Sequence, residues 1–144
     1  MKYMNKMMGV LLGGTLMMGA LALPATSLAA DKTKVVIQVS TNDPATWNLA
    51  LNNAQNIQQG LGKDNADIEI VAFGPGIGML KAESEVANRV NEAVDSGMQV
   101  TACQNTMHSQ KLNKEDMNSK VGYVPAGVVE IIRRQQQGYA YLRP

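Results

Sequence analysis

The sequence is short of the residues from which most catalytic and metal sites are built. Its 144 residues include one cysteine, Cys103, and one histidine, His108. It contains no Cys-x-x-Cys pair, no His-Glu-x-x-His motif and no Gly-x-Ser-x-Gly turn. Serine hydrolase triads and zinc sites are therefore disfavoured, since each needs several such side chains at set spacings. We expect neither a bound metal ion nor a cofactor.

An excess of charge of one sign is also missing. Lysine and arginine together number 13, and aspartate and glutamate together number 12. Nucleic acids and anionic membrane surfaces both select proteins with clustered basic residues. We therefore expect no nucleic-acid partner and no binding to a membrane surface.

Long hydrophobic runs are absent except at the amino terminus. There, Lys2 and Lys6 precede an apolar run at residues 7–23, and Pro24 then opens a series of small residues that includes Ala29. This order is typical of a secretory signal peptide. The run is short for a membrane span, and no basic cluster follows it. We expect cleavage after Ala29.

The predicted mature protein is residues 30–144, with residues 1–29 as the signal peptide. Its length of about 115 residues is typical of one domain. Loss of Lys2 and Lys6 leaves 11 basic residues against 12 acidic ones, a formal net charge of −1. No other segment is apolar enough to span a bilayer. We therefore expect a single periplasmic or secreted domain that has no membrane contact after cleavage.

Short β-branched runs alternate with amphipathic segments along the mature chain. Strands are expected at residues 33–40, 68–73, 98–102, 121–124 and 139–143. Helices are expected at residues 44–61, 83–96 and 125–137. Asp43 is suited to cap the first helix, because Pro44 follows it. The alternation predicts a mainly parallel sheet with helices on both faces.

Three polar or glycine-rich segments follow the first three expected strands. They are Ser40–Asp43, Gly74–Gly78 and Cys103–Met107. Ligands bind outside the carboxyl ends of parallel strands, so these segments form the predicted site. The candidate pocket-lining residues are Ser40, Asn42, Gly76, Asn105 and Thr106. The glycine segment lacks the lysine and the spacing of a phosphate-binding loop, and Pro75 has no amide hydrogen, so a tight turn is favoured.

A lone cysteine cannot cross-link its own chain but can bridge to another chain. Besides such a bridge, Cys103 admits three interpretations. Free cysteine is often a buried apolar filler, in which case its role is structural. Its place between a strand and an expected helix start favours a reactive thiol instead, because amide dipoles there lower the pKa of a thiol. Exported chains also rarely keep a lone thiol without a use. In the third interpretation, Cys103, Met107 and His108 supply soft ligands for copper(I), a weaker alternative.

Four segments of the mature chain form a specific combination. They are VVIQVS, VAFGPGIGML, VTACQNTM and VGYVPAGVVEIIRRQQQGYAYLRP. On these segments the chain resembles the DsrE/DsrF-like family of small sulfur-relay proteins, from Lys34 to Pro144. The resemblance implies a flavodoxin-like, three-layer α/β/α fold with about five strands, and oligomers such as trimers and hexamers. It also implies that a cysteine after the third strand carries sulfur as a persulfide, and Cys103 matches that position.

Together these observations predict an exported sulfur-handling protein, at most a sulfurtransferase-like sulfur carrier. Cys103 is expected to accept sulfane sulfur as a persulfide and to pass it on. Its expected partners are sulfur donor and acceptor proteins or small sulfur compounds, and a homo-oligomer, a trimer or a hexamer, is expected. The alternative is a non-catalytic oligomeric binding or assembly module in which Cys103 is structural.

Overall fold

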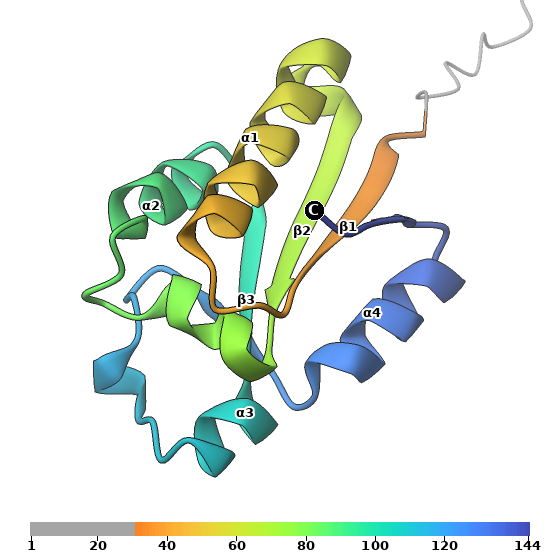
Figure 1. The fold of residues 1–144 in the computed structure, drawn as a ribbon. Coiled ribbons are helices and arrows are strands. Elements are labelled where there is room, and N and C mark those ends of the chain that lie inside the picture. The colour runs from red at the N-terminus through yellow and green to blue at the C-terminus, as the bar shows by residue number, and fades with distance from the viewer. Residues whose placement is uncertain (1–30) are drawn as a thin grey trace, which may run out of the picture.

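The computed structural model describes residues 31–144. The predicted signal peptide and its cleavage site lie outside these residues. Figure 1 shows a twisted sheet with helices packed against it. Among the described residues, no helix is both long and apolar enough to cross a membrane.

Five parallel strands form the sheet, in the order β4-β3-β2-β1-β5. The strands are β1 (Thr33–Val39), β2 (Ala66–Ala72), β3 (Gln99–Cys103), β4 (Gly122–Val124) and β5 (Ala140–Leu142). This confirms the expected five-stranded α/β class, and the sheet is entirely parallel. The chain places β1 to β4 side by side in sequence order and then returns to add β5 next to β1.

The helices are α1 (Pro44–Leu61), α2 (Ala87–Asp95), α3 (Gln104–Ser109) and α4 (Gly127–Gln136). Three of the connections between helices and strands contain 3₁₀ turns. They are η1 (Lys63–Asn65), η2 (Gly74–Leu80) and η3 (Lys114–Asp116). The Asp43 carboxylate accepts hydrogen bonds from the amides of Ala45 and Thr46, at 3.2 and 3.1 Å. Since Pro44 also occupies the first turn, α1 begins where the sequence predicts.

Two expected helix starts are wrong. The second helix begins at Ala87, not at residue 83, because the preceding segment forms turns in which the Ser84 amide bonds the Lys81 carbonyl. The last helix begins at Gly127, not at Pro125, whose carbonyl accepts a hydrogen bond from the Asn105 amide instead. The glycine segment is the 3₁₀ turn η2, as the preference for a tight turn indicated.

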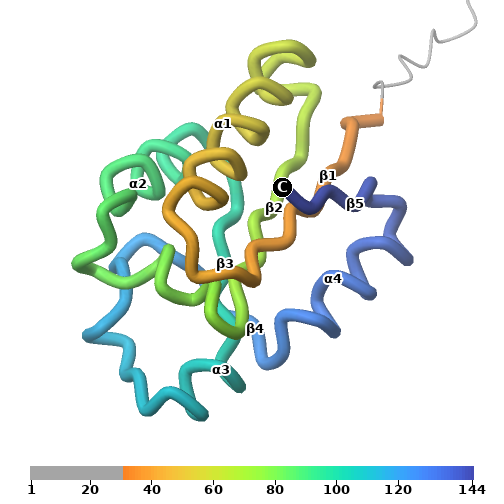
Figure 2. Tube along the Cα trace, in the orientation of Figure 1, coloured from red at the N-terminus to blue at the C-terminus, as the bar shows by residue number. Residues whose placement is uncertain are grey.

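The two faces of the sheet carry separate apolar cores, because neighbouring residues of a strand point to opposite faces. The larger core joins alternate residues of β1, β2 and β3 to α1, α2 and α3, and it includes Ile37, Ile70, Val100 and Met107. The smaller core contains Val36, Val71, Ile131 and Tyr139. Figure 2 shows α4 apart from α1 and α2, on the other side of the sheet. The fold is therefore a three-layer α/β/α arrangement, as expected.

A charged cluster lies under α4 on this second face. Glu69 of β2 is fully buried, and Arg134 of α4 forms ion pairs with both Glu69 and Glu130. The Thr101 hydroxyl donates to Glu69 at 2.9 Å. A buried carboxylate is tolerated only when it is paired and hydrogen-bonded, so this cluster holds α4 against the sheet.

We predict that Arg134→Met destabilises the protein by about 3–5 kcal/mol, because it leaves the Glu69 charge buried without a cation. The matched control is Arg133→Met, since the Arg133 side chain is 53% exposed and its buried partner, Glu130, keeps the ion pair with Arg134. That control should cost about 1 kcal/mol or less. Urea unfolding measures both changes.

Removing both charges should recover most of the loss, because no unpaired buried ion remains. A Glu69→Met/Arg134→Met variant as unstable as the single variant would contradict this account of the cluster.

Candidate functional site around Cys103

Cys103 is the last residue of β3 and the residue that precedes α3. It points to the same face of the sheet as Thr101, the face covered by α4, because residues two apart in a strand share a face. In the sheet it lies opposite Val124 of β4. The pairing of Ala72 with Ala102 places Phe73 beside it on the other flank. The residue is only 4% exposed.

Four donors surround the Cys103 sulfur. The Thr106 hydroxyl and the backbone amides of Gly127, Thr106 and Asn105 are placed to donate hydrogen bonds to the thiolate form of this sulfur. Burial by itself raises the pKa of the Cys103 thiol, but these hydrogen bonds outweigh it and lower the pKa below the ordinary value. The reason is that each donor stabilises the thiolate more than the protonated thiol.

Two helix starts converge on this sulfur, one from each face of the sheet. The amides of Asn105 and Thr106 come from the first turn of α3, and the amide of Gly127 comes from the first turn of α4. The Asn105 amide also donates to the Pro125 carbonyl at 3.1 Å, which ties the two starts together. Amides in the first turn of a helix have no partner within the helix, so they are free to bond a thiolate.

Gly127 permits the close approach of α4. A Cβ atom built on it would lie 3.0 Å from the Cβ and Cδ1 atoms of Phe73. A side chain at this position would therefore push α4 away from the Phe73 ring and from the thiol. Gly127 is not among the residues predicted from the sequence, although a glycine inside the helix expected at residues 125–137 is unfavourable and marks a position where space is needed.

The topology explains why the site forms here. The chain leaves β3 toward α3, whose Met107 lies in the larger core, and leaves β4 toward α4 on the opposite face. Adjacent parallel strands whose connections diverge in this way leave a crevice at their carboxyl ends, where α/β proteins bind ligands. Cys103 lies at this point of divergence.

The predicted pocket residues separate into two groups. Asn105 and Thr106 contact Cys103, as described above. Ser40, Asn42 and Gly76 lie instead around the end of β1, two strand spacings from β3, which is about 10 Å.

The second group has mainly structural contacts. The Ser40 hydroxyl accepts a hydrogen bond from Gln38 at 3.0 Å. A Cβ atom on Gly76 would lie 2.3 Å from the Val39 carbonyl oxygen, so Gly76 allows the turn to pack directly on β1. The Gly76 amide bonds the Phe73 carbonyl within the same turn, which leaves it unavailable to cradle a phosphate. Asn42 is exposed and borders a surface groove.

One hydrogen-bonded link joins the glycine turn to the thiol. The Gly74 amide donates to the Thr106 hydroxyl at 2.9 Å, and that hydroxyl is one of the four donors placed around the Cys103 sulfur. The Gly74 carbonyl accepts from the Gln110 carboxamide at 3.2 Å. Both backbone groups of Gly74 are thus held by α3 and the residue that follows it.

The three soft ligands considered for copper do not converge. Cys103 faces α4, whereas Met107 is buried in the larger core on the other face, and His108 is exposed. Within residues 31–144 there is also no group of three or more histidine, cysteine, aspartate or glutamate side chains that could hold a metal ion. The geometry therefore gives no support to the copper alternative.

Comparison with known proteins places the chain in a family. The model of the DsrE/DsrF-like family matches residues 33–144. The chain belongs to the DsrE/DsrF-like family. Membership suggests a sulfur-relay role and confirms the resemblance seen in the sequence. No curated protein matches this chain.

Solved structures agree with this assignment. A protein of unknown function, MTH1491 from Methanobacterium thermoautotrophicum, is 32% identical, with a TM-score of 0.75 over 78% of this chain and 100% of its own. The ychN protein of E. coli is 12% identical, with a TM-score of 0.64 over 78% of this chain and 99% of its own. BT1422 of Bacteroides thetaiotaomicron is 18% identical, with a TM-score of 0.63 over 77% of this chain and 94% of its own. The last two share the fold with this DsrE/DsrF-like chain.

We predict that the rate of Cys103 alkylation by iodoacetamide rises with pH, and that the midpoint of this rise lies below the midpoint of an ordinary thiol, which is about pH 8.5. The lowered pKa of Cys103 keeps more of the thiol ionised at neutral pH. The alkylation rate is lost as the pH falls below this pKa, because only the thiolate reacts. Thr106→Val should move the midpoint up, since it removes the hydroxyl donor. Thr106→Ser keeps that donor and serves as the control.

Unfolding the protein in urea provides the reference state for this measurement, because all four hydrogen bonds are then lost. The midpoint should rise to that of a free thiol. Equal midpoints in the folded and unfolded protein would show that the amides and the hydroxyl do not act on the sulfur.

Proposed function

We propose that this protein is a sulfur carrier in which Cys103 accepts sulfane sulfur as a persulfide and transfers it to a second thiol. The observation that carries the proposal is the arrangement of four hydrogen-bond donors around one thiol at the point where the sheet connections diverge. A thiolate is the nucleophile in sulfur exchange, so a site that stabilises the thiolate supports this chemistry. The family assignment points to the same class of role.

The two transfer steps balance without any external oxidant or reductant. In the first, the Cys103 thiolate attacks the outer sulfur of a donor persulfide, the donor S–S bond breaks, and the donor leaves as a thiolate. In the second, an acceptor thiolate attacks the outer sulfur on Cys103, and the Cys103 thiolate is released. The same amides that stabilise the thiolate can bond the charged persulfide, because both carry the negative charge on sulfur.

A second candidate function is an assembly module in which Cys103 is structural. The small exposed fraction of Cys103, 4%, favours this candidate, since a donor must reach the sulfur for transfer to occur. The two candidates differ in one measurable respect. Only the carrier gains sulfur on Cys103 in the folded state.

We also propose that the protein works outside the cytoplasm, in the periplasm or after secretion. The support is the charged, apolar and small-residue order of residues 1–29. Working partners would then be donor and acceptor proteins or small sulfur compounds of that compartment.

We predict that protein isolated from the producing cells and incubated with a small persulfide gains the mass of one or more sulfur atoms. Intact mass spectrometry measures the gain, and the mass before incubation shows whether the chain begins at Ala30. A reductant should remove the added sulfur, and Cys103→Ser should show no gain. An unprocessed chain would contradict the proposed location outside the cytoplasm and would leave the proposed sulfur chemistry unaffected.

The control for access is the unfolded protein, in which any thiol can react. A chain that gains sulfur only after unfolding would identify Cys103 as structural and would leave the assembly module as the function.

We further propose that the protein forms a homo-oligomer, a trimer or a hexamer, through the outer face of α4. Three apolar side chains of this short helix, Val128, Val129 and Ile132, are 52%, 60% and 55% exposed. Tyr141 of the adjacent β5 is 43% exposed. Contiguous apolar surface of this kind marks protein interfaces, and a domain of this size has little core to spare.

We predict that Ile132→Glu converts the oligomer to a folded monomer, because a carboxylate in the centre of an apolar interface loses its water. Light scattering measures the mass, and circular dichroism checks the fold. The control is Leu49→Glu, since Leu49 is a similarly exposed apolar residue, at 46%, on α1. A wild-type protein that is monomeric at micromolar concentration would contradict the proposal.

A further inference from the structure

A second feature lies at the same edge of the sheet, and Cys103 does not line it. It is a groove of about 250 Å³, lined by Asn42, Pro75, Gly78, Lys81 and Gln110. These residues come from the turn after β1, from η2 and the residue that follows it, and from the end of α3. The groove therefore lies outside the carboxyl ends of the strands, where α/β sheets bind ligands. We call it the Lys81 groove.

The Lys81 groove has a positive charge and no negative one. Lys81 is its only ionisable residue, and the side chain is half-buried. Among the ion pairs within residues 31–144, Lys81 takes part in none. The nearby carboxylate of Asp43 is bound to the first turn of α1. A partly buried cation without an acidic partner is a favourable site for an anion.

Two carboxamides add neutral hydrogen-bond donors to the ammonium group. Gln110 uses one N–H on the Gly74 carbonyl, at 3.2 Å, and its second N–H remains available. The Asn42 side chain forms no hydrogen bond with the other described residues. An ammonium group and two carboxamides match the several acceptor oxygens of an oxyanion better than they match a halide.

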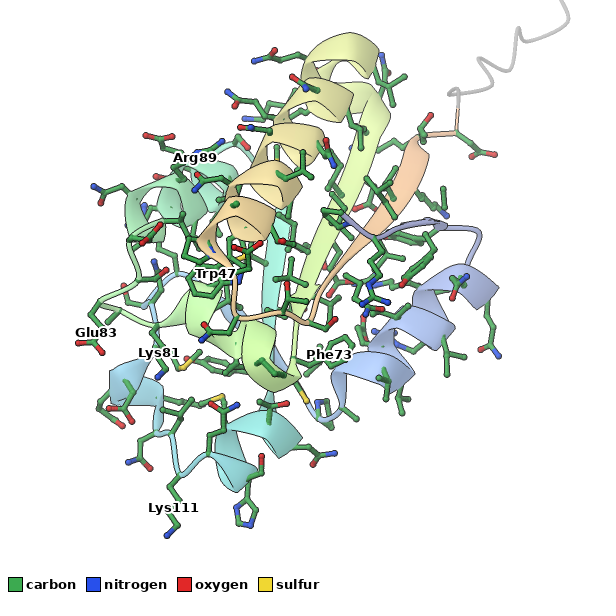
Figure 3. All side chains as sticks on the ribbon, in the orientation of Figure 1. Trp47, Phe73, Lys81, Glu83, Arg89 and Lys111 are labelled. Carbon is green, nitrogen blue, oxygen red and sulfur yellow. The ribbon has the colours of Figure 1, made fainter. Side chains whose placement is uncertain are left out.

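Gly78 lets η2 pack closely against Trp47 and Asn42. A Cβ atom on this residue would lie 3.2 Å from the Trp47 ring and 3.3 Å from the Asn42 side-chain oxygen. Trp47 and Lys81 are both labelled in Figure 3, near the green coil of η2. The volume of about 250 Å³ is below the range of pockets for drug-sized ligands, about 300–1,000 Å³. The space is suited to a small anion and not to a nucleotide cofactor.

We propose that the Lys81 groove binds the oxyanion group of a small molecule, a carboxylate or a sulfur oxyanion. Gly74 connects it to the thiol, because Gln110 and Thr106 hold the two backbone groups of this residue. If Cys103 carries sulfur, which rests on the proposed function, the groove favours anionic donors over neutral ones.

Calorimetric titration at low ionic strength tests the groove with two unreactive probes, sulfate and acetate, and chloride as the reference. Sulfate binding that is tighter than acetate binding identifies a sulfur-oxyanion site, and the reverse order identifies a carboxylate site. Lys81→Gln should weaken binding by about tenfold or more, the effect of one charge-assisted hydrogen bond. Lys81→Arg keeps the charge and should retain binding, which excludes a general folding defect.

The matched control is Lys63→Gln, because Lys63 is exposed in η1, before β2 and away from this edge. It removes the same charge and should bind the probes as the wild type does. Cys103→Ser should also bind them fully, so failure of the sulfur-carrier role leaves this result intact. The proposal is overturned if neither probe binds, if chloride competes on equal terms, or if Lys63→Gln weakens binding as much as Lys81→Gln.

Discussion

One change of direction in the chain determines where the site forms. Right-handed crossovers that add strands in a single direction place all their helices on one face of the sheet. From β1 to β4 this chain adds strands in one direction, and the larger core with α1, α2 and α3 results. Only the return from β4 to β5 places a helix, α4, on the other face. That return brings the first amide of α4 to the sulfur of Cys103 on the face opposite α1 and α2.

The environment of the thiol is a balance between two opposing effects. Burial favours the protonated form, and hydrogen-bond donors favour the thiolate. The pKa of Cys103 is lowered, because several donors act on one sulfur atom and together outweigh the effect of burial. The charged cluster of Glu69, Glu130 and Arg134 supports this arrangement from a distance, since it fixes the helix that supplies one of the donors. The environment of the thiol thus depends on ion pairs that the sulfur does not contact.

Local signals in the sequence predicted most of the fold. Runs of β-branched or aromatic residues marked the five strands, and Asp43 with Pro44 marked the start of α1, because these preferences act over a few neighbouring residues. Cys103, Asn105 and Thr106 were identified for the same reason. Gly127 and Lys81 were missed, since their roles come from contacts with segments about 50 and 40 residues away in the chain, and spacing within a segment carries no trace of such contacts. The buried pairing of Glu69 with Arg134 is likewise invisible until the sheet and α4 are placed together.

The solitary cysteine has a kinetic consequence for any sulfur chemistry at this site. Many thiol enzymes discharge their sulfur by forming a disulfide with a neighbouring cysteine of the same chain, at a rate that does not depend on concentration. This chain has no such neighbour, because Cys103 is its only cysteine. In the proposed carrier, loading and unloading would both be bimolecular, so each step would be first order in its own partner. The lifetime of the loaded state would then be set by the abundance of the acceptor, and the proposed carrier would hold its sulfur for as long as the acceptor is scarce.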